Sequence, residues 1–130
     1  MEQLAEKTRK GTVAPIDLEV SDLHAWYGES HALHGMNLTV RKGELVTLMG
    51  RNGAGKSTTL NCINGLIRKR KGRIQFRGTD VLRATPEKIA RMGMATCPED
   101  RAIFGSLTVG ENFHLPPLLN DRGMSDEEIF

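Results

Sequence analysis

Long apolar runs are what this sequence most clearly lacks. No stretch approaches the roughly 20 consecutive apolar residues that cross a bilayer, and the opening MEQLAEK has no apolar segment typical of a secretory signal. We therefore expect a cytoplasmic chain. Its 130 residues, 38% hydrophobic and 26% charged, have the composition of a single globular domain.

Cysteine is also scarce. Cys62 and Cys97 lie far apart without CxxC spacing, so we predict two reduced, packed thiols and no disulfide partner. The chain has four histidines, His24, His31, His34 and His114. Their spacing matches no metal-ligand motif, and we interpret them as surface or packed side chains.

Charge of one sign is not in large excess, since the formal net charge is only +2. The one dense basic run spans residues 68–73, where a phosphate-binding patch is one reading. A solvated helix end and turn is the favoured reading, because cations suit a helix C-terminus. No aromatic residues interleave with the run, so we expect no nucleic-acid partner.

Residues 1–15 show no periodicity and are predicted to form a flexible N-terminal extension. Apolar and polar residues then alternate over residues 18–23 and 36–41, which predicts half-buried strands forming an antiparallel element. The run 45–49 does not alternate and is bounded by a turn and a glycine. This pattern is typical of a strand buried on both faces, so we predict the central strand of a parallel sheet.

Helical spacing follows in Leu60, Ile63 and Ile67, which predicts a helix over about 56–66 docked on that sheet. Residues 72–78 are predicted to return to strand, with Ile74 and Phe76 facing inward.

Three further helix starts and one strand are predicted downstream. Thr85 and Pro86 supply an N-cap and a first-turn proline for a short helix, with Ile89 and Met92 on its apolar side. Residues 94–97 should form another strand. Capping-box patterns at 108–111 and 125–128 predict that a helix begins at each.

The strongest motif is Gly50-x-x-x-x-Gly55-Lys56-Ser57, a phosphate-binding loop. Glycines let successive backbone N–H groups turn toward an anion, and the helix that follows adds its positive end. Lys56 can reach the β and γ phosphates, while the Ser57 hydroxyl suits Mg²⁺. The alternatives are a glycine turn that binds nothing and a dinucleotide site, which Thr58 disfavours because a third glycine or alanine should stand there.

The sequence around the loop distinguishes between classes of nucleoside triphosphate-binding protein. The loop comes about fifty residues into the chain, after an antiparallel element, whereas small GTPases and nucleotide kinases open with it. Trp26 and Tyr27 lie upstream, and Glu99 follows the predicted strand at 94–97. No Asn-Lys-x-Asp guanine-reading motif is present.

Over residues 16–130 the chain resembles the ATP-binding subunits of ABC transporters, and among them the branched-chain amino-acid importers of bacteria. Segments 23–35, 45–56 and 97–101 carry the resemblance. It implies an α/β P-loop NTPase fold, the ABC-type nucleotide-binding domain, with an antiparallel β subdomain and a parallel core sheet flanked by helices. Residues 16–130 would be the N-terminal portion of that domain.

The resemblance also implies roles for individual residues. Tyr27 would stack on adenine, although a core pair with Trp26 or a surface patch is the alternative. Glu99 stands where most ABC proteins carry the Q-loop glutamine, and would act with Lys56 in catalysis and with Ser57 on Mg²⁺; a solvated loop acid is the alternative. The implied nucleotide-binding residues are Tyr27, Gly50, Arg51, Asn52, Gly53, Ala54, Gly55, Lys56, Ser57 and Thr58.

By the same resemblance the chain would bind Mg·ATP as the energy-coupling subunit of an importer for branched-chain amino acids. It would pair with a second ATP-binding subunit, identical or related, and with transmembrane permease subunits on the inner face of the membrane. The family's signature, Walker B acids and switch histidine are not found in residues 1–130. We therefore expect a truncated domain that does not turn over ATP alone, exposes an apolar edge and aggregates.

Three other functions stay open from sequence. One is a non-hydrolysing nucleotide-binding remnant, and another is the ATPase subunit of a urea or amide importer. An ABC-type ATPase of DNA repair or chromosome heads is disfavoured, because no heptad run begins here.

Overall fold

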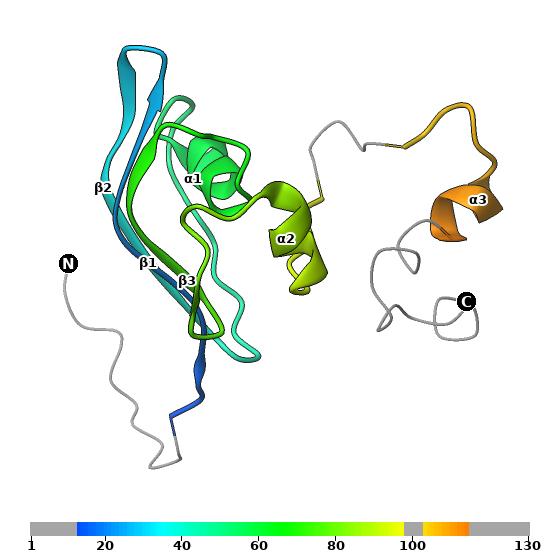
Figure 1. Cartoon of the computed structure of the whole chain (residues 1–130), viewed down its shortest axis with the longest axis horizontal. Coiled ribbons are helices and arrows are strands. Elements are labelled where there is room, and N and C mark those ends of the chain that lie inside the picture. Colours follow the sequence, from blue (N-terminus) through cyan, green and yellow to red (C-terminus); the bar gives the residue numbers. More distant parts are fainter. Residues whose placement is uncertain (1–12, 98–102, 115–130) are drawn as a thin grey trace.

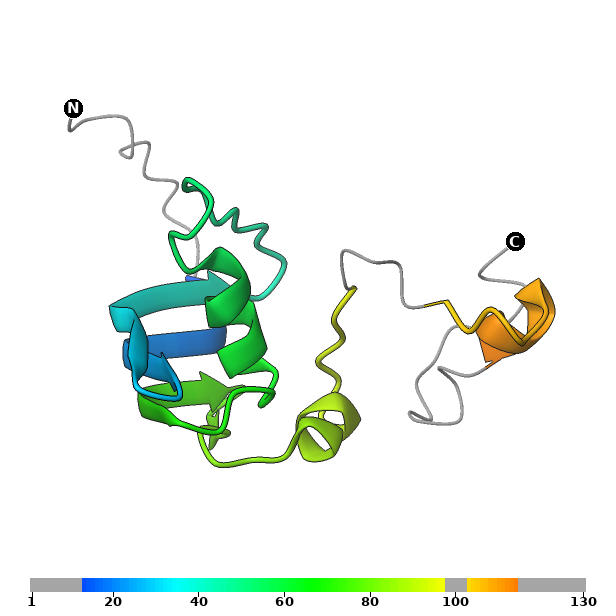
Figure 2. The same cartoon turned by 90° about the horizontal axis from the view of Figure 1, so that it is seen from above.

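A computed structural model describes residues 13–97 and 103–114 (Figure 1). The elements are β1 (Ile16–Tyr27), β2 (Ser30–Arg41), α1 (Lys56–Ile63), β3 (Arg70–Phe76), β4 (Thr79–Asp80), α2 (Pro86–Arg91) and α3 (Val109–His114). The strands form one antiparallel sheet in the order β2-β1-β3-β4. Figure 2, which looks along the sheet, shows α1 packed against one of its faces.

A long hairpin dominates the sheet. β1 and β2 are each 12 residues long and pair antiparallel, from Ile16 opposite Arg41 to Tyr27 opposite Ser30. The connection at Gly28 is tight, and its φ of 58° is a left-handed value that glycine adopts without strain. The predicted antiparallel element is thus confirmed, and its strands are longer than the alternating segments alone indicated.

The hydrophobic core lies between the sheet and α1, with contributions from the loops that flank β3 and from α2. Its buried members are Val20, Leu23, Ala25, Leu33, Cys62, Ile63, Ile67, Ile74, Phe76, Val81 and Ile89. Full burial of one large apolar side chain stabilises the fold by about 1.5–3 kcal/mol. The inward orientation predicted for Ile74 and Phe76 is confirmed.

Two side chains differ from their predicted placement. Leu60 was expected on the docked face of the helix, but it is 47% exposed because α1 presents Thr59, Cys62 and Ile63 to the sheet instead. The Cys97 thiol is exposed rather than packed, since the segment that carries it is not part of the core. Cys62 is buried as predicted, and neither described cysteine forms a disulfide.

The predicted parallel sheet is not present in the described part of the chain, and this corrects the interpretation of two segments. Neither residues 45–49 nor residues 94–97 form a strand. Leu45 is 93% exposed and Met49 is 90% exposed, the opposite of a strand buried on both faces. A central strand requires partners along both edges, and no described segment pairs with either run.

Element boundaries follow local backbone chemistry. α1 begins at Lys56 as predicted but ends at Ile63, because Gly65 adopts a left-handed φ of 78°. Its amide donates to the Cys62 carbonyl and the Leu66 amide donates to the Asn61 carbonyl, which is the Schellman arrangement that terminates a helix. The strand predicted at 72–78 is observed as β3, displaced two residues toward the N-terminus.

The predicted caps of the two short helices are confirmed. Thr85 Oγ1 accepts from the Lys88 amide at the start of α2, with Pro86 in the first turn. At α3, the Glu111 amide donates to Thr108 Oγ1 while Glu111 Oε2 accepts from the Thr108 amide, a complete capping box. The pattern at 125–128 lies outside the described residues. No described helix has the length and apolar character of a membrane span.

Candidate functional site: the phosphate-binding loop

The loop of residues 50–55 leads directly into α1 and is shaped by its glycines. Gly53 and Gly55 have φ values of 84° and 98°, in the left-handed region that L side chains rarely occupy. The Ala54 amide donates to the Arg51 carbonyl at 3.0 Å, which closes a turn between them. Glycine at positions 53 and 55 therefore allows the backbone conformation of the loop.

Gly55 also fixes the loop against the sheet. A Cβ at this position would lie 2.7 Å from Leu33 Cδ2 and 3.7 Å from the Ala32 carbonyl oxygen, both on β2. Leu33 is a buried core residue, so it has little freedom to move aside. The support that β2 gives the loop has no signal in the local sequence, because the contact joins Gly55 to residues more than 20 positions earlier in the chain.

Lys56 turns back onto the loop that precedes it. Its Nζ donates to the Gly50 carbonyl at 2.6 Å and to the Arg51 carbonyl at 2.9 Å. The ammonium is thereby held at the start of the loop while its own backbone opens α1. A positive charge and the N-terminus of a helix meet at this point, and both attract anions.

The first turn of α1 is open to a ligand. Its N-cap residue is Gly55, no side chain caps the helix, and the first turn contains no acid. The first N–H groups of a helix have no intrahelical acceptor, so an anion can take this place. Thr59 is 2% exposed and its Oγ1 donates to the Gly55 carbonyl at 2.8 Å, which ties the helix start to the core.

Three other side chains are predicted to contact the nucleotide or its Mg²⁺, and the structure describes two of them, Ser57 and Tyr27. Ser57 is exposed in the first turn of α1, where a hydroxyl is accessible to a hard cation. Tyr27 is 52% exposed at the end of β1, on the same hairpin that supports Gly55 through Leu33. Glu99 lies outside the described residues.

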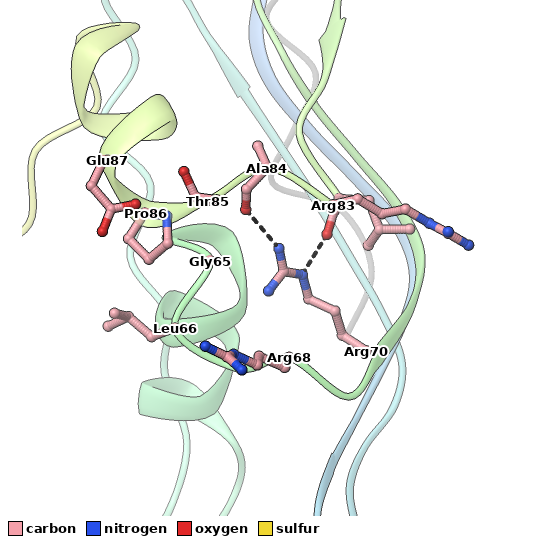
Figure 3. Close-up of a pocket in the computed structure, with 10 residues that line it drawn as sticks. Gly65, Leu66, Arg68, Arg70, Arg83, Ala84, Thr85, Pro86 and Glu87 are labelled. Carbon is pink, nitrogen blue, oxygen red and sulfur yellow. Dashed lines mark hydrogen bonds between the residues drawn. The ribbon is translucent and has the colours of Figure 1, made fainter.

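A second concave region lies between the end of α1 and the start of α2 (Figure 3). It has a volume of about 730 Å³. Arg70 lines it and donates to the carbonyls of Ile67, Leu82 at 2.7 Å and Ala84 at 3.4 Å. Burial lowers the pKa of Arg70 and raises the pKa of Cys62. The guanidinium is thus occupied in joining two loops, and no residue of the phosphate-binding loop lines the region.

Comparisons with known proteins agree on one protein family. The family model for ABC transporters matches residues 33–129. The high-affinity branched-chain amino acid transport ATP-binding protein BraG of Pseudomonas aeruginosa is 37% identical over 105 residues, which cover 81% of this chain and 45% of that protein. The ribose import ATP-binding protein RbsA of Bacillus subtilis is 33% identical, over 77% of this chain and 20% of that protein.

Solved structures agree. An ATP-binding subunit of an ABC transporter superposes with a TM-score of 0.71 at 36% identity, covering 85% of this chain and 44% of the other. An ATP-binding cassette in its ADP conformation has a TM-score of 0.68 at 28% identity, covering 86% and 43% respectively. This chain therefore spans less than half the length of these relatives.

Proposed function

Because this chain belongs to the ABC transporter family and has the fold of part of its ATP-binding domain, we propose that residues 50–58 bind the phosphates of ATP. The observation that carries the proposal is the position of Lys56, held by two carbonyls of the loop beside an uncapped helix start. ATP phosphate oxygens would replace the Gly50 and Arg51 carbonyls as acceptors for this ammonium. The bonds to the carbonyls are charge-assisted through the ammonium alone, whereas phosphate oxygens would add the attraction of an opposite charge.

The other nucleotide contacts follow from the same arrangement. Backbone N–H groups of Gly53 and of residues 55–58 would surround the phosphates. The Ser57 hydroxyl would ligate Mg²⁺, which neutralises charge on the triphosphate when bound. Tyr27 would stack on the adenine ring. Glu99 is proposed as an additional Mg²⁺ ligand and catalytic group at the Q-loop position.

We further propose that this chain is part of the energy-coupling ATPase subunit of an importer. It would act with a second ATP-binding subunit and with transmembrane permease subunits, which would hold it at the membrane surface. The relative BraG supports branched-chain amino acids as the solute. Other relatives are named for ribose, for xylose and arabinose, and for general L-amino acids. The choice of solute therefore varies among relatives with a similar ATP-binding sequence.

Binding of a fluorescent ATP analogue to the 130-residue chain, with and without Mg²⁺, tests the nucleotide proposal. Lys56→Ala should weaken binding at least about tenfold, since a charge-assisted hydrogen bond contributes roughly 1.5–3 kcal/mol. Lys88→Ala, at another lysine in the first half of α2, is the matched control and should bind like the wild type. Equal affinity in the wild type and Lys56→Ala would contradict the proposal.

A further inference from the structure

A ladder of aromatic rings covers part of the hairpin away from α1. Along β1, Leu23 and Ala25 are buried in the core, so His24 and Trp26 project from the opposite face. From β2, His31 stacks on Trp26 with ring centroids 4.5 Å apart and an interplanar angle of 9°. His34 lies against His31 at 3.9 Å between centroids, and His24 lies at 5.2 Å from it.

Two ring nitrogens converge within this ladder. His24 Nδ1 and His31 Nε2 are 3.0 Å apart. The other nitrogen of His24, Nε2, lies 3.0 Å from Asp22 Oδ1. A carboxylate accepts but does not donate, so Nε2 carries the hydrogen and the neutral ring presents its Nδ1 lone pair toward His31.

The backbone holds Asp22 in the conformation that makes this contact. Its φ is 47°, a left-handed value that Asp tolerates better than most residues. The pairing of β1 with both neighbours shifts register around this residue, which marks a bulge. The Asp22 amide donates to Asn37 Oδ1 at 2.9 Å, so the bulge is tied to β2 and its carboxylate points at His24.

We propose that His24 Nδ1 and His31 Nε2 form a two-histidine binding site for a divalent late transition metal, Cu²⁺ or Ni²⁺. On binding, His31 would take the tautomer with its hydrogen on Nδ1, so that solvent exchanges the proton from Nε2 to Nδ1, the ring stays neutral and the Nε2 lone pair is available to the metal. Water would fill the remaining coordination positions. Asp22 would be the carboxylate that orients a ligating histidine through its second nitrogen, an arrangement common at metal sites. The site shares no residue with the phosphate-binding loop.

The nitrogen separation is that of a hydrogen bond, and it is also close to the spacing of two nitrogens bound to one metal at a right angle. Two nitrogens that are each about 2.0–2.1 Å from a metal lie roughly 3 Å apart when the angle between the bonds is near 90°. A tetrahedral angle would separate them by roughly 3.4 Å at the same bond length. Right-angled nitrogen ligation is the tetragonal geometry of Cu²⁺ and Ni²⁺. Among the described residues, no group of three or more His, Cys, Asp or Glu side chains is arranged to hold a metal, so a closed tetrahedral Zn²⁺ site is not expected.

Calorimetric titration of the untagged 130-residue chain with Ni²⁺ tests the proposal, because Ni²⁺, unlike Cu²⁺, does not oxidise the thiols of Cys62 and Cys97. The wild type should bind one equivalent, and His31→Phe and His24→Phe should each abolish saturable binding. Phenylalanine keeps an aromatic ring in the ladder but has no nitrogen ligand. Asp22→Asn should weaken binding by about tenfold or more, as losses of such supporting groups do.

His114→Ala, which removes a histidine of α3, is the matched control and should bind Ni²⁺ like the wild type. Far-UV circular dichroism should show that both phenylalanine variants keep the strand content of the wild type. Ring resonances of His24 and His31 should broaden first when Ni²⁺ is added in an NMR titration. Undiminished binding in both phenylalanine variants, or no saturable Ni²⁺ binding by the wild type, would overturn the proposal.

Discussion

At the scale of single residues, the phosphate-binding loop is shaped before any ligand arrives. Lys56 holds the Gly50 and Arg51 carbonyls, and Gly55 rests on Leu33 of the core. In the proposed binding mode, a ligand would exchange acceptors on an existing ammonium rather than order a free chain, which would lower the entropic cost of binding. The packing of Gly55 is therefore as necessary to the site as the charge of Lys56.

Substitution of Gly55 tests this packing. Gly55→Ala would place a methyl group 2.7 Å from Leu33 Cδ2 at a φ of 98°. We expect a loss of unfolding free energy of about 2–5 kcal/mol, the sum of left-handed strain and overpacking. Urea denaturation measures it, and the fluorescent ATP analogue should bind more weakly because the loop is displaced.

Gly53→Ala is the control for Gly55→Ala. Its φ is 84°, but no atom lies within 4 Å of the added Cβ. Only the strain term of about 1–2 kcal/mol should appear. If the two variants were equally stable, the Leu33 contact would not be what holds the loop.

At the scale of secondary-structure elements, the sheet depends on a close approach of β3 to its neighbour β1 at the bulge around Asp22. A Cβ on Gly72 would lie 2.3 Å from the Asp22 carbonyl oxygen, at a φ of 123°. Gly72→Ala should therefore cost about 2 kcal/mol or more in urea denaturation, because backbone cannot move aside as a side chain can. Gly78→Ala, with φ of 79° and nothing within 4 Å, should cost only the strain of about 1–2 kcal/mol.

A comparably small loss in Gly72→Ala would contradict the close approach of β3 to β1. The same variant should disturb the Asp22 carboxylate and hence the Ni²⁺ affinity of the hairpin. Gly78→Ala should leave that affinity unchanged, since Gly78 lies beyond the end of β3.

The start of α3 is a second element whose stability should depend on pH. Hydrogen bonds from the Thr108 backbone amide, then from its hydroxyl, lower the pKa of Glu111. A carboxyl whose pKa is lower in the folded state stabilises that state above its unfolded pKa, near 4.3. This contribution is lost as the pH falls through the folded pKa, so helical Cα chemical shifts over 109–114 should decline there.

Glu111→Gln keeps an oxygen acceptor but cannot titrate in this range. Its α3 shifts should be insensitive to pH over the window in which the wild type changes. A wild-type helix that persists unchanged well below the folded pKa would show that the capping box does not stabilise α3.

Features that depend on neighbouring residues can be predicted from this sequence, whereas burial and contacts between distant segments cannot. The caps at Thr85 and Thr108 and the start of α1 at Lys56 depend on neighbours within a few residues, so sequence was enough to predict them. Leu45 and Met49 have the composition of a buried strand, but burial requires other segments to cover them. The same limit hid the Leu33 support for the loop and the convergence of His24 with His31.

At the scale of the whole molecule, the described residues leave an apolar surface uncovered. Leu45 and Met49 are 93% and 90% exposed, and neither belongs to the hydrophobic core around α1. Exposed apolar side chains in an unpaired extended segment favour association between chains. The sheet supplies a stable platform for the phosphate-binding loop, and the segment that enters the loop pairs with no strand of the described residues.

The 130-residue chain should therefore associate reversibly, with an average mass by light scattering that rises with concentration. Replacing both exposed residues in Leu45→Ser/Met49→Ser should reduce this rise, because each substitution removes apolar surface worth roughly 25 cal/mol per Å². Val13→Ser, at a valine that is 72% exposed outside the segment, is the control and should associate like the wild type. A wild type that stays monomeric at every concentration would mean that residues 44–50 are covered in solution, and the exposed run could not then be the driving surface.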